Sequence, residues 1–171
     1  MKSHKGMRPQ DLAILLKIAA KGTQEWLMKD LAQELEISAS EVSESLHRSV
    51  LAGLIAPDKK RLMRLALQEF LVHGLRYVYP QEPGALVRGL PTAHSAPPLQ
   101  AEITGSADIY VWPFAQGTIR GQAIEPLYPK LPAACLKDQV FYELMALIDA
   151  FRVGKARERA LAERLLKERL C

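Results

Sequence analysis

The sequence predicts a mainly α-helical protein with a small β component. Apolar residues recur at helical intervals towards both ends of the 171-residue chain, whereas nine of the eleven prolines fall between Pro80 and Pro132, where they exclude long helices. Apolar residues make up 49% and charged residues 25%, as is usual for a globular chain with a sizeable core. We therefore expect three parts: helices in 1–76, Pro/Gly-rich loops and strands in 77–134, and helices in 135–171.

Three short helices are expected in the first part. Apolar residues at three- and four-residue intervals predict helices over 9–21, 28–35 and 39–52. Ser38 is placed to cap the third helix, because Glu41 three positions later completes the spacing of a capping box. The start of the third helix is therefore well defined by the sequence.

The next elements follow from local composition. Leu54 and Ile55 favour the start of a strand before Pro57, and the charged run 59–61 opens another apolar helical run that ends near Gly74. The segment 75–80 favours a strand, since tyrosine and valine dominate it and a proline closes it.

The middle and the end of the chain predict one hairpin and one or two long helices. The segments 108–114 and 118–124 read as a β-hairpin around a short loop that contains Gly117. Apolar residues at helical spacing then run through 136–170, where Gly154 is expected to separate two helices.

The second and third helices have the ingredients of a helix-turn-helix. A tight bridge at Glu36 and Ile37 joins them, and the small side chain of Ala32 allows the two helix axes to approach closely. Ser38 fixes where the third helix starts, and that start determines which side chains reach base edges in a major groove.

Residues 26–55 contain three short patterns: D-L-A-x-x-L at 30–35, I-S-x-S-x-V-S-x-S-L at 37–46 and A-G-L-I at 52–55. Together they resemble the winged helix-turn-helix of bacterial transcription regulators, broadly of the MarR type. The resemblance implies that residues 39–52 are a recognition helix and that a β-hairpin wing follows. Glu36 stands where such motifs often have glycine, so it must adopt an uncommon backbone conformation. Only a few residues after Ile55 are left for the wing.

We expect double-stranded DNA to be contacted by polar side chains in two groups. The first lies at the start and on the surface of the predicted recognition helix: Ser38, Ser40, Ser43, Glu44, His47 and Arg48. The second follows it and would hold the DNA backbone: Lys59, Lys60, Arg61 and Arg64. The same side chains also fit an ordinary solvated helix surface.

The sequence thus predicts a cytoplasmic, homodimeric DNA-binding transcription regulator that acts as a repressor. The long C-terminal helices are expected to supply the dimer contact. The alternative is a protein-interaction or antitoxin-like adaptor whose Pro-rich middle binds a partner protein. A third interpretation is a small-molecule sensor with an aromatic pocket lined by Tyr110, Trp112, Phe114 and Tyr128.

No enzyme, metal site, cofactor or membrane span is predicted. The four histidines and Cys135 do not have metal-ligand spacing, and no nucleophile-elbow, zincin or phosphate-loop pattern occurs. The first ten residues lack the apolar core of a signal peptide, and both cysteines, Cys135 and Cys171, are expected to be reduced. The net charge of +4 is compatible with a polyanionic partner.

Overall fold

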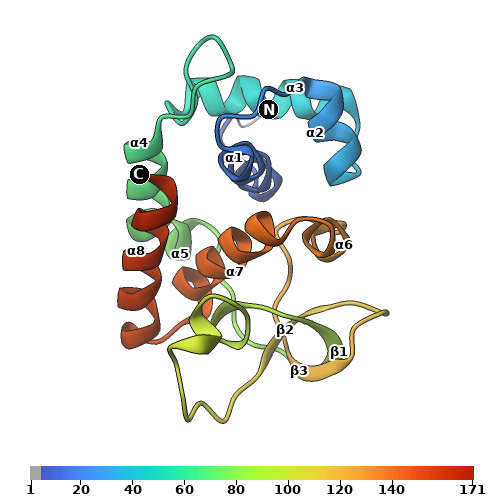
Figure 1. The fold of residues 1–171 in the computed structure, drawn as a ribbon, viewed down its shortest axis with the longest axis vertical. Helices are drawn as coiled ribbons and strands as arrows, with labels where there is room; N and C mark the ends of the chain where they lie inside the picture. The colour runs from blue at the N-terminus through green and yellow to red at the C-terminus, as the bar shows by residue number, and fades with distance from the viewer. Residues whose placement is uncertain (1–4) are drawn as a thin grey trace.

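Helix α1 (Pro9–Lys21) occupies the middle of the protein in the computed structural model, which describes residues 5–171 (Figure 1). Every residue from Asp11 to Ala19 is buried. Helices α2 (Met28–Leu35) and α3 (Ala39–Leu51) pack on one side of α1, and α7 (Gln139–Val153) packs on the other (Figure 1). The three predicted parts of the chain therefore share one hydrophobic core.

The predicted turn between α2 and α3 is confirmed. Glu36 adopts the left-handed conformation, with φ 56° and ψ 45°, as expected for a residue at a position that favours glycine. Ser38 caps α3, because its Oγ accepts from the Glu41 N–H at 3.1 Å and the Glu41 carboxylate accepts from the Ser38 N–H at 3.2 Å. The turn is thus fixed at one end by the backbone conformation of Glu36 and at the other end by the capping box of Ser38 and Glu41.

A very short hairpin follows α3. Its strands make a single bridge between Ile55 and Leu62, and the Asp58 carboxylate accepts from two N–H groups of the turn, those of Lys60 and Arg61. The charged run 59–61 therefore lies in this turn, and the expectation that it opens a helix is wrong. This hairpin follows α3, where the resemblance predicts a wing, and it contains only this one bridge.

Helix α4 (Arg64–Glu69), a π-helical turn (Phe70–Gly74) and α5 (Leu75–Val78) continue one another. The predicted strand at 75–80 is therefore wrong. Leu67, Leu71 and Leu75 are fully buried at four-residue intervals, so burial of this stripe overrides the strand preference of the following tyrosine and valine residues.

The sheet has a different topology from the predicted hairpin. Strands β2 (Tyr110–Pro113) and β3 (Ile119–Ala123) pair in parallel, and β1 (Leu86–Pro91) is antiparallel to both. The sequence analysis missed β1, a short strand that contains Gly89 and ends in proline. A Cβ on Gly117 would overlap the backbone of Gly89, so glycine is required where the β2–β3 connection crosses β1.

The C-terminal part contains α6 (Leu131–Leu136), α7 and α8 (Ala156–Leu170), with Gly154 between the last two as predicted. The apolar side chains of α8 face α7 and α4, and Ala162, Leu165, Leu166 and Leu170 are buried there. The expected dimer contact through the C-terminal helices stays a prediction, and it would have to use residues outside this apolar face, which the chain itself covers. Within residues 5–171, none of the helices has the length and apolar character needed to cross a bilayer.

A buried carboxylate, Asp149 of α7, joins the sheet to the helices. Its Oδ2 accepts from the Trp112 indole N–H and from the Thr92 hydroxyl, each at 2.7 Å, and its Oδ1 lies 2.9 Å from Nη1 of Arg152. Arg152 in turn donates to the carbonyl of Tyr79 at the end of the α4–α5 helix. One carboxylate thus joins Trp112, Thr92 and Arg152.

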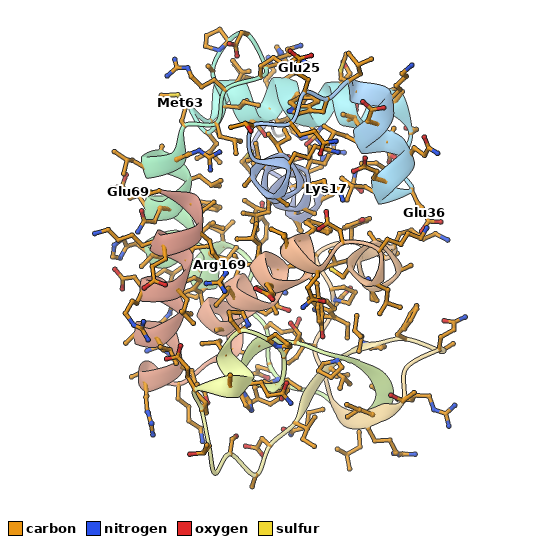
Figure 2. All side chains as sticks on the ribbon, in the orientation of Figure 1. Lys17, Glu25, Glu36, Met63, Glu69 and Arg169 are labelled. Carbon is orange, nitrogen blue, oxygen red and sulfur yellow. The ribbon has the colours of Figure 1, made fainter. Side chains whose placement is uncertain are left out.

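A second ionic cluster lies where α1 and α2 meet α7. The ammonium group of Lys17 is 2.6 Å from the Asp138 carboxylate and 3.2 Å from that of Glu34, within the packed side chains between α1 and α7 (Figure 2). Burial alone would raise the pKa of Asp138, but hydrogen bonds from Lys17 and from the Phe141 N–H, with the charge of Lys17, lower it below its usual value.

We predict that Asp149→Ala lowers the free energy of unfolding by about 3–5 kcal/mol, because it leaves the Arg152 guanidinium without its carboxylate partner and the buried Trp112 and Thr92 donors without their acceptor. Urea denaturation followed by tryptophan fluorescence measures this loss. The control Glu163→Ala, on the exposed side of α8, is expected to stay within about 0.5 kcal/mol of the parent protein. Equal stabilities of the two variants would contradict the role of Asp149.

Asp138→Asn is predicted to cost about 1–3 kcal/mol at neutral pH, because asparagine keeps the N-cap of α7 but loses the charge-assisted bond to Lys17. Since the folded-state pKa of Asp138 is lowered, its contribution is complete above the unfolded-state value of about 3.9 and is lost as the pH falls through the folded-state value. The stability difference between the two proteins should therefore shrink below about pH 4. A difference that is constant from pH 7 to pH 3, measured against an exposed Glu69→Gln control, would refute this linkage.

Candidate nucleic-acid interface

Helix α3 lies along the end of the molecule that is opposite to the sheet (Figure 1). Its inner face buries Val42, Ser45, Leu46 and Ser49. Its outer face exposes Ser40, Glu44 and His47, with Ser43 half-buried between them. Neither the C-terminal part nor the sheet covers this outer face, so α3 has an accessible polar surface along its length.

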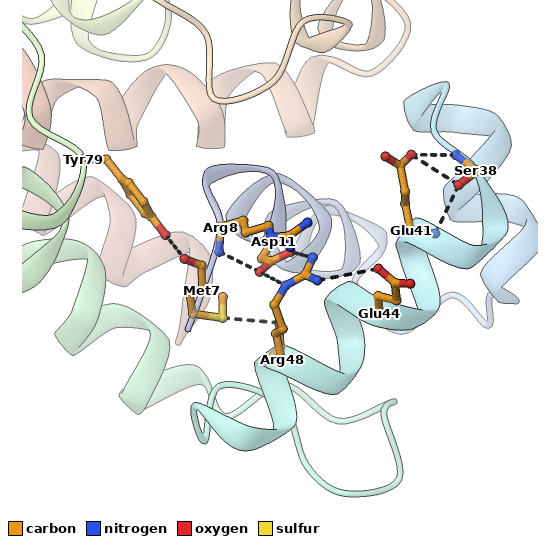
Figure 3. Close-up of polar contacts among 9 residues, drawn as sticks. Met7, Arg8, Asp11, Ser38, Glu41, Glu44, Arg48 and Tyr79 are labelled. Carbon is orange, nitrogen blue, oxygen red and sulfur yellow. Dashed lines mark hydrogen bonds and ion pairs between the residues drawn. The ribbon is translucent and has the colours of Figure 1, made fainter. Parts of the chain in front are cut away.

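Arg48 is placed differently from its predicted role as a DNA contact. Its Nε and Nη2 atoms donate to the two carboxylate oxygens of Asp11 at 2.8 and 2.7 Å, and Asp11 is fully buried in α1 (Figure 3). The hydrogen bond with Asp11 raises the pKa of Arg48 above its usual value. The structure therefore assigns Arg48 to holding α3 on α1.

Three other predicted contact residues also have partners inside the protein. Ser38 caps α3. The Lys60 ammonium donates to the Trp26 carbonyl at 2.7 Å and lies 4.0 Å from the centre of the Trp26 ring. Arg64 donates to the Leu170 carbonyl at 3.0 Å, where it satisfies the C-terminal end of α8. Each of these side chains thus has a structural role within the protein.

The remaining predicted residues are available on the surface. The side chains of Ser43, His47 and Lys59 have no hydrogen-bond or ion-pair partner within residues 5–171, and the Arg61 side chain is exposed. Ser40 lies beside Ser38, with 3.5 Å between their hydroxyl oxygens. Glu44 lies 4.0 Å from Nη1 of Arg48, so its charge is partly offset.

The structure adds two residues that the sequence analysis did not select. Lys5 and Arg8, in the segment before α1, line an open hollow of about 440 Å³ beside α3. The other lining residues come from α3 and the hairpin: Ser43, Glu44, His47, Arg48, Leu51 and Lys59. The basic character of the first ten residues was the available signal, but only the fold brings this segment next to the predicted recognition helix.

The segment before α1 is held in place by its main chain. The Tyr79 hydroxyl donates to the Met7 carbonyl at 2.7 Å, and the Arg8 N–H donates to Asp11 at 2.8 Å (Figure 3). Burial, followed by the charge of Asp11, raises the pKa of Tyr79 to about 12, so its phenol stays a hydrogen-bond donor at neutral pH. Lys5 and Arg8 therefore extend from an anchored backbone.

The aromatic residues proposed as a ligand pocket are largely part of the core. Trp112 is fully buried against Asp149, Tyr128 donates to the Leu35 carbonyl from a buried position, and Tyr110 packs edge-on against His94. Phe114 is half-buried. The predicted aromatic pocket is therefore wrong, because these side chains are used in packing. In the described part of the chain, no three histidine, cysteine or acidic side chains come together to hold a metal ion.

We predict that alanine substitutions at the adjacent residues Arg48 and His47 of α3 have very different effects on the free energy of unfolding. Arg48→Ala should lower the free energy of unfolding by about 3–5 kcal/mol, because it leaves the Asp11 carboxylate buried without its counter-charge. His47→Ala should change stability by less than about 0.5 kcal/mol, since the side chain is exposed and unpaired. Thermal and urea unfolding of both variants provides the test, and a stable Arg48→Ala protein would show that the ion pair is dispensable.

Comparisons with known proteins do not assign the chain to a family. No protein-family model, no curated protein and no solved structure matches it. The resemblance to MarR-type regulators therefore rests on the residues of the motif alone, and the function proposed below rests on geometry and charge.

Proposed function

We propose that this protein binds double-stranded DNA through the outer face of α3 and regulates transcription. The observation that carries the proposal is the combination of a fixed turn and a free polar surface. The left-handed turn at Glu36 and the cap at Ser38 set the direction of α3, and on its outer face the side chains of Ser43 and His47 have no partner among residues 5–171. Serine and histidine side chains can donate to or accept from base edges in the major groove.

The acidic residues of α3 are compatible with this proposal. Glu41 completes the capping box, where its charge also interacts favourably with the positive end of the helix. Glu44 is close to Arg48, and a carboxylate can accept from the N4 group of cytosine. The Glu41 carboxylate is offset at the start of the helix, whereas the exposed Glu44 carboxylate is expected to face a base edge and not a phosphate.

We also propose that the protein acts as a homodimeric repressor. The two copies would meet through a surface other than the apolar face of α8, because that face is covered within each copy. Two copies related by a two-fold axis would place two α3 helices on successive major grooves, about 34 Å apart. An operator with two inverted half-sites is therefore expected.

A second candidate function is favoured by apolar side chains on the sheet. Leu86 is 65% exposed, Ile109 43% and Ile119 39%, and the hollows beside the sheet bring these residues together. Exposed apolar groups of this kind are typical of protein-binding surfaces. The alternative is thus an adaptor whose Pro-rich middle binds a partner protein while α3 is unused.

The test begins with selection of duplexes from a random pool by the full chain, followed by anisotropy titrations with the enriched sequence. Ser43→Ala and His47→Ala should each weaken specific binding by roughly 5- to 100-fold, as the loss of a base contact does. They should leave non-specific binding nearly unchanged. The control is His73→Ala, which removes an exposed histidine from the π-helical turn.

Two results would contradict the proposed function. The first is a pool that shows no enriched sequence and no affinity at low salt. The second is an enriched site whose affinity falls equally, or not at all, in the α3 variants and in the His73→Ala control. Retention of a partner protein by the same chain, lost on Leu86→Asp but not on His47→Ala, would favour the adaptor.

A further inference from the structure

Basic side chains from three separate segments of the chain line the hollow beside α3. Lys5 and Arg8 come from the arm before α1, Arg48 from α3, and Lys59 from the tip of the short hairpin. Glu44 is the one carboxylate among the lining residues, against these four cations. We call this hollow, with the lining residues given above, the basic groove.

The four cations are not equivalent, because a buried anion neutralises only one of them. Asp11 accepts two hydrogen bonds from Arg48. The charge of that guanidinium is therefore already balanced, although its side chain still lines the groove. Lys5, Arg8 and Lys59 have no carboxylate within ion-pair distance in the described residues. Three positive charges are therefore left for an anion from outside the chain.

The main chain beside these cations is held in place before any ligand arrives. Met7 and Arg8 are held through main-chain atoms by Tyr79 and Asp11, and the hairpin turn that carries Lys59 is tied by the Asp58 carboxylate. The side chains that carry the charge are not used in this anchoring. A pre-positioned set of cations binds an anion with a smaller entropic cost than a flexible tail does.

We propose that the basic side of this groove, formed by Lys5, Arg8 and Lys59, binds the phosphodiester backbone of the DNA strand beside the major groove, while Ser43 and His47 on the α3 side of the groove face the base edges. The inference rests on the proposed function and deepens it, because it assigns the backbone contact to Lys5, Arg8 and Lys59 and removes it from Arg48, Lys60 and Arg64. Phosphate contacts of this kind position a recognition helix and carry little sequence information.

The test compares two double variants that remove the same charge. Lys5→Ala/Arg8→Ala removes two cations from the groove, and Arg88→Ala/Arg120→Ala removes two exposed arginines that face each other across β1 and β3, at the far end of the molecule (Figure 1). Both keep the main-chain anchors. Thermal unfolding verifies the fold of each variant.

Affinity for the selected duplex is measured from about 50 to 200 mM salt, where each lost phosphate contact reduces the slope of log affinity against log salt by about 0.9. The groove variant should lose about one to two units of slope and about tenfold or more in affinity at the lowest salt. Its order of preference among duplex sequences should stay the same. The sheet variant should keep the parent slope.

Equal slopes and affinities in the two double variants would overturn the groove while leaving sequence reading by α3 intact. A groove variant that loses sequence preference instead of salt dependence would also overturn it, since the arm would then read bases. A parent chain with no affinity for any duplex would overturn both the groove and the proposed function.

Discussion

The buried carboxylate of Asp11 organises the N-terminal part of this protein. This carboxylate on the central helix accepts hydrogen bonds from the main-chain N–H of Arg8 and from Nε and Nη2 of Arg48. It therefore holds both the segment before α1 and helix α3 against α1. A buried ion pair contributes little net stability compared with apolar packing, but breaking it is costly. Its main physical effect here is to specify one arrangement of three segments, and the proposed DNA-binding surface is built from two of them.

Local signals in the sequence were sufficient for elements whose ends are marked by particular residues. The capping box at Ser38 and Glu41, the apolar spacing of the first three helices and the break at Gly154 all predicted what the fold contains. The unusual conformation of Glu36 also followed from its place in the motif. These features depend on interactions between residues a few positions apart, so they can be predicted from the sequence without knowledge of the fold.

Features that depend on distant partners were not predictable in the same way. The tyrosine- and valine-rich segment after Gly74 favoured a strand, but the buried stripe that ends at Leu75 keeps it helical. The strand β1 has a weak pattern and exists because β2 and β3 pair with it. Arg48 and Arg64 had the chemistry of DNA contacts, yet Asp11 and the end of α8 lie 37 and 106 positions away in the sequence.

The burial of α1 on all sides has a consequence for how this chain can be divided. The helix that supports α3 uses its opposite surface against α7, and Lys17 extends that contact to Asp138. A fragment that stopped after α5 would expose this surface and leave Lys17 without one of its two carboxylates. The segment from α1 to α3 is therefore not expected to keep its fold without α7, because α1 packs between α3 and α7.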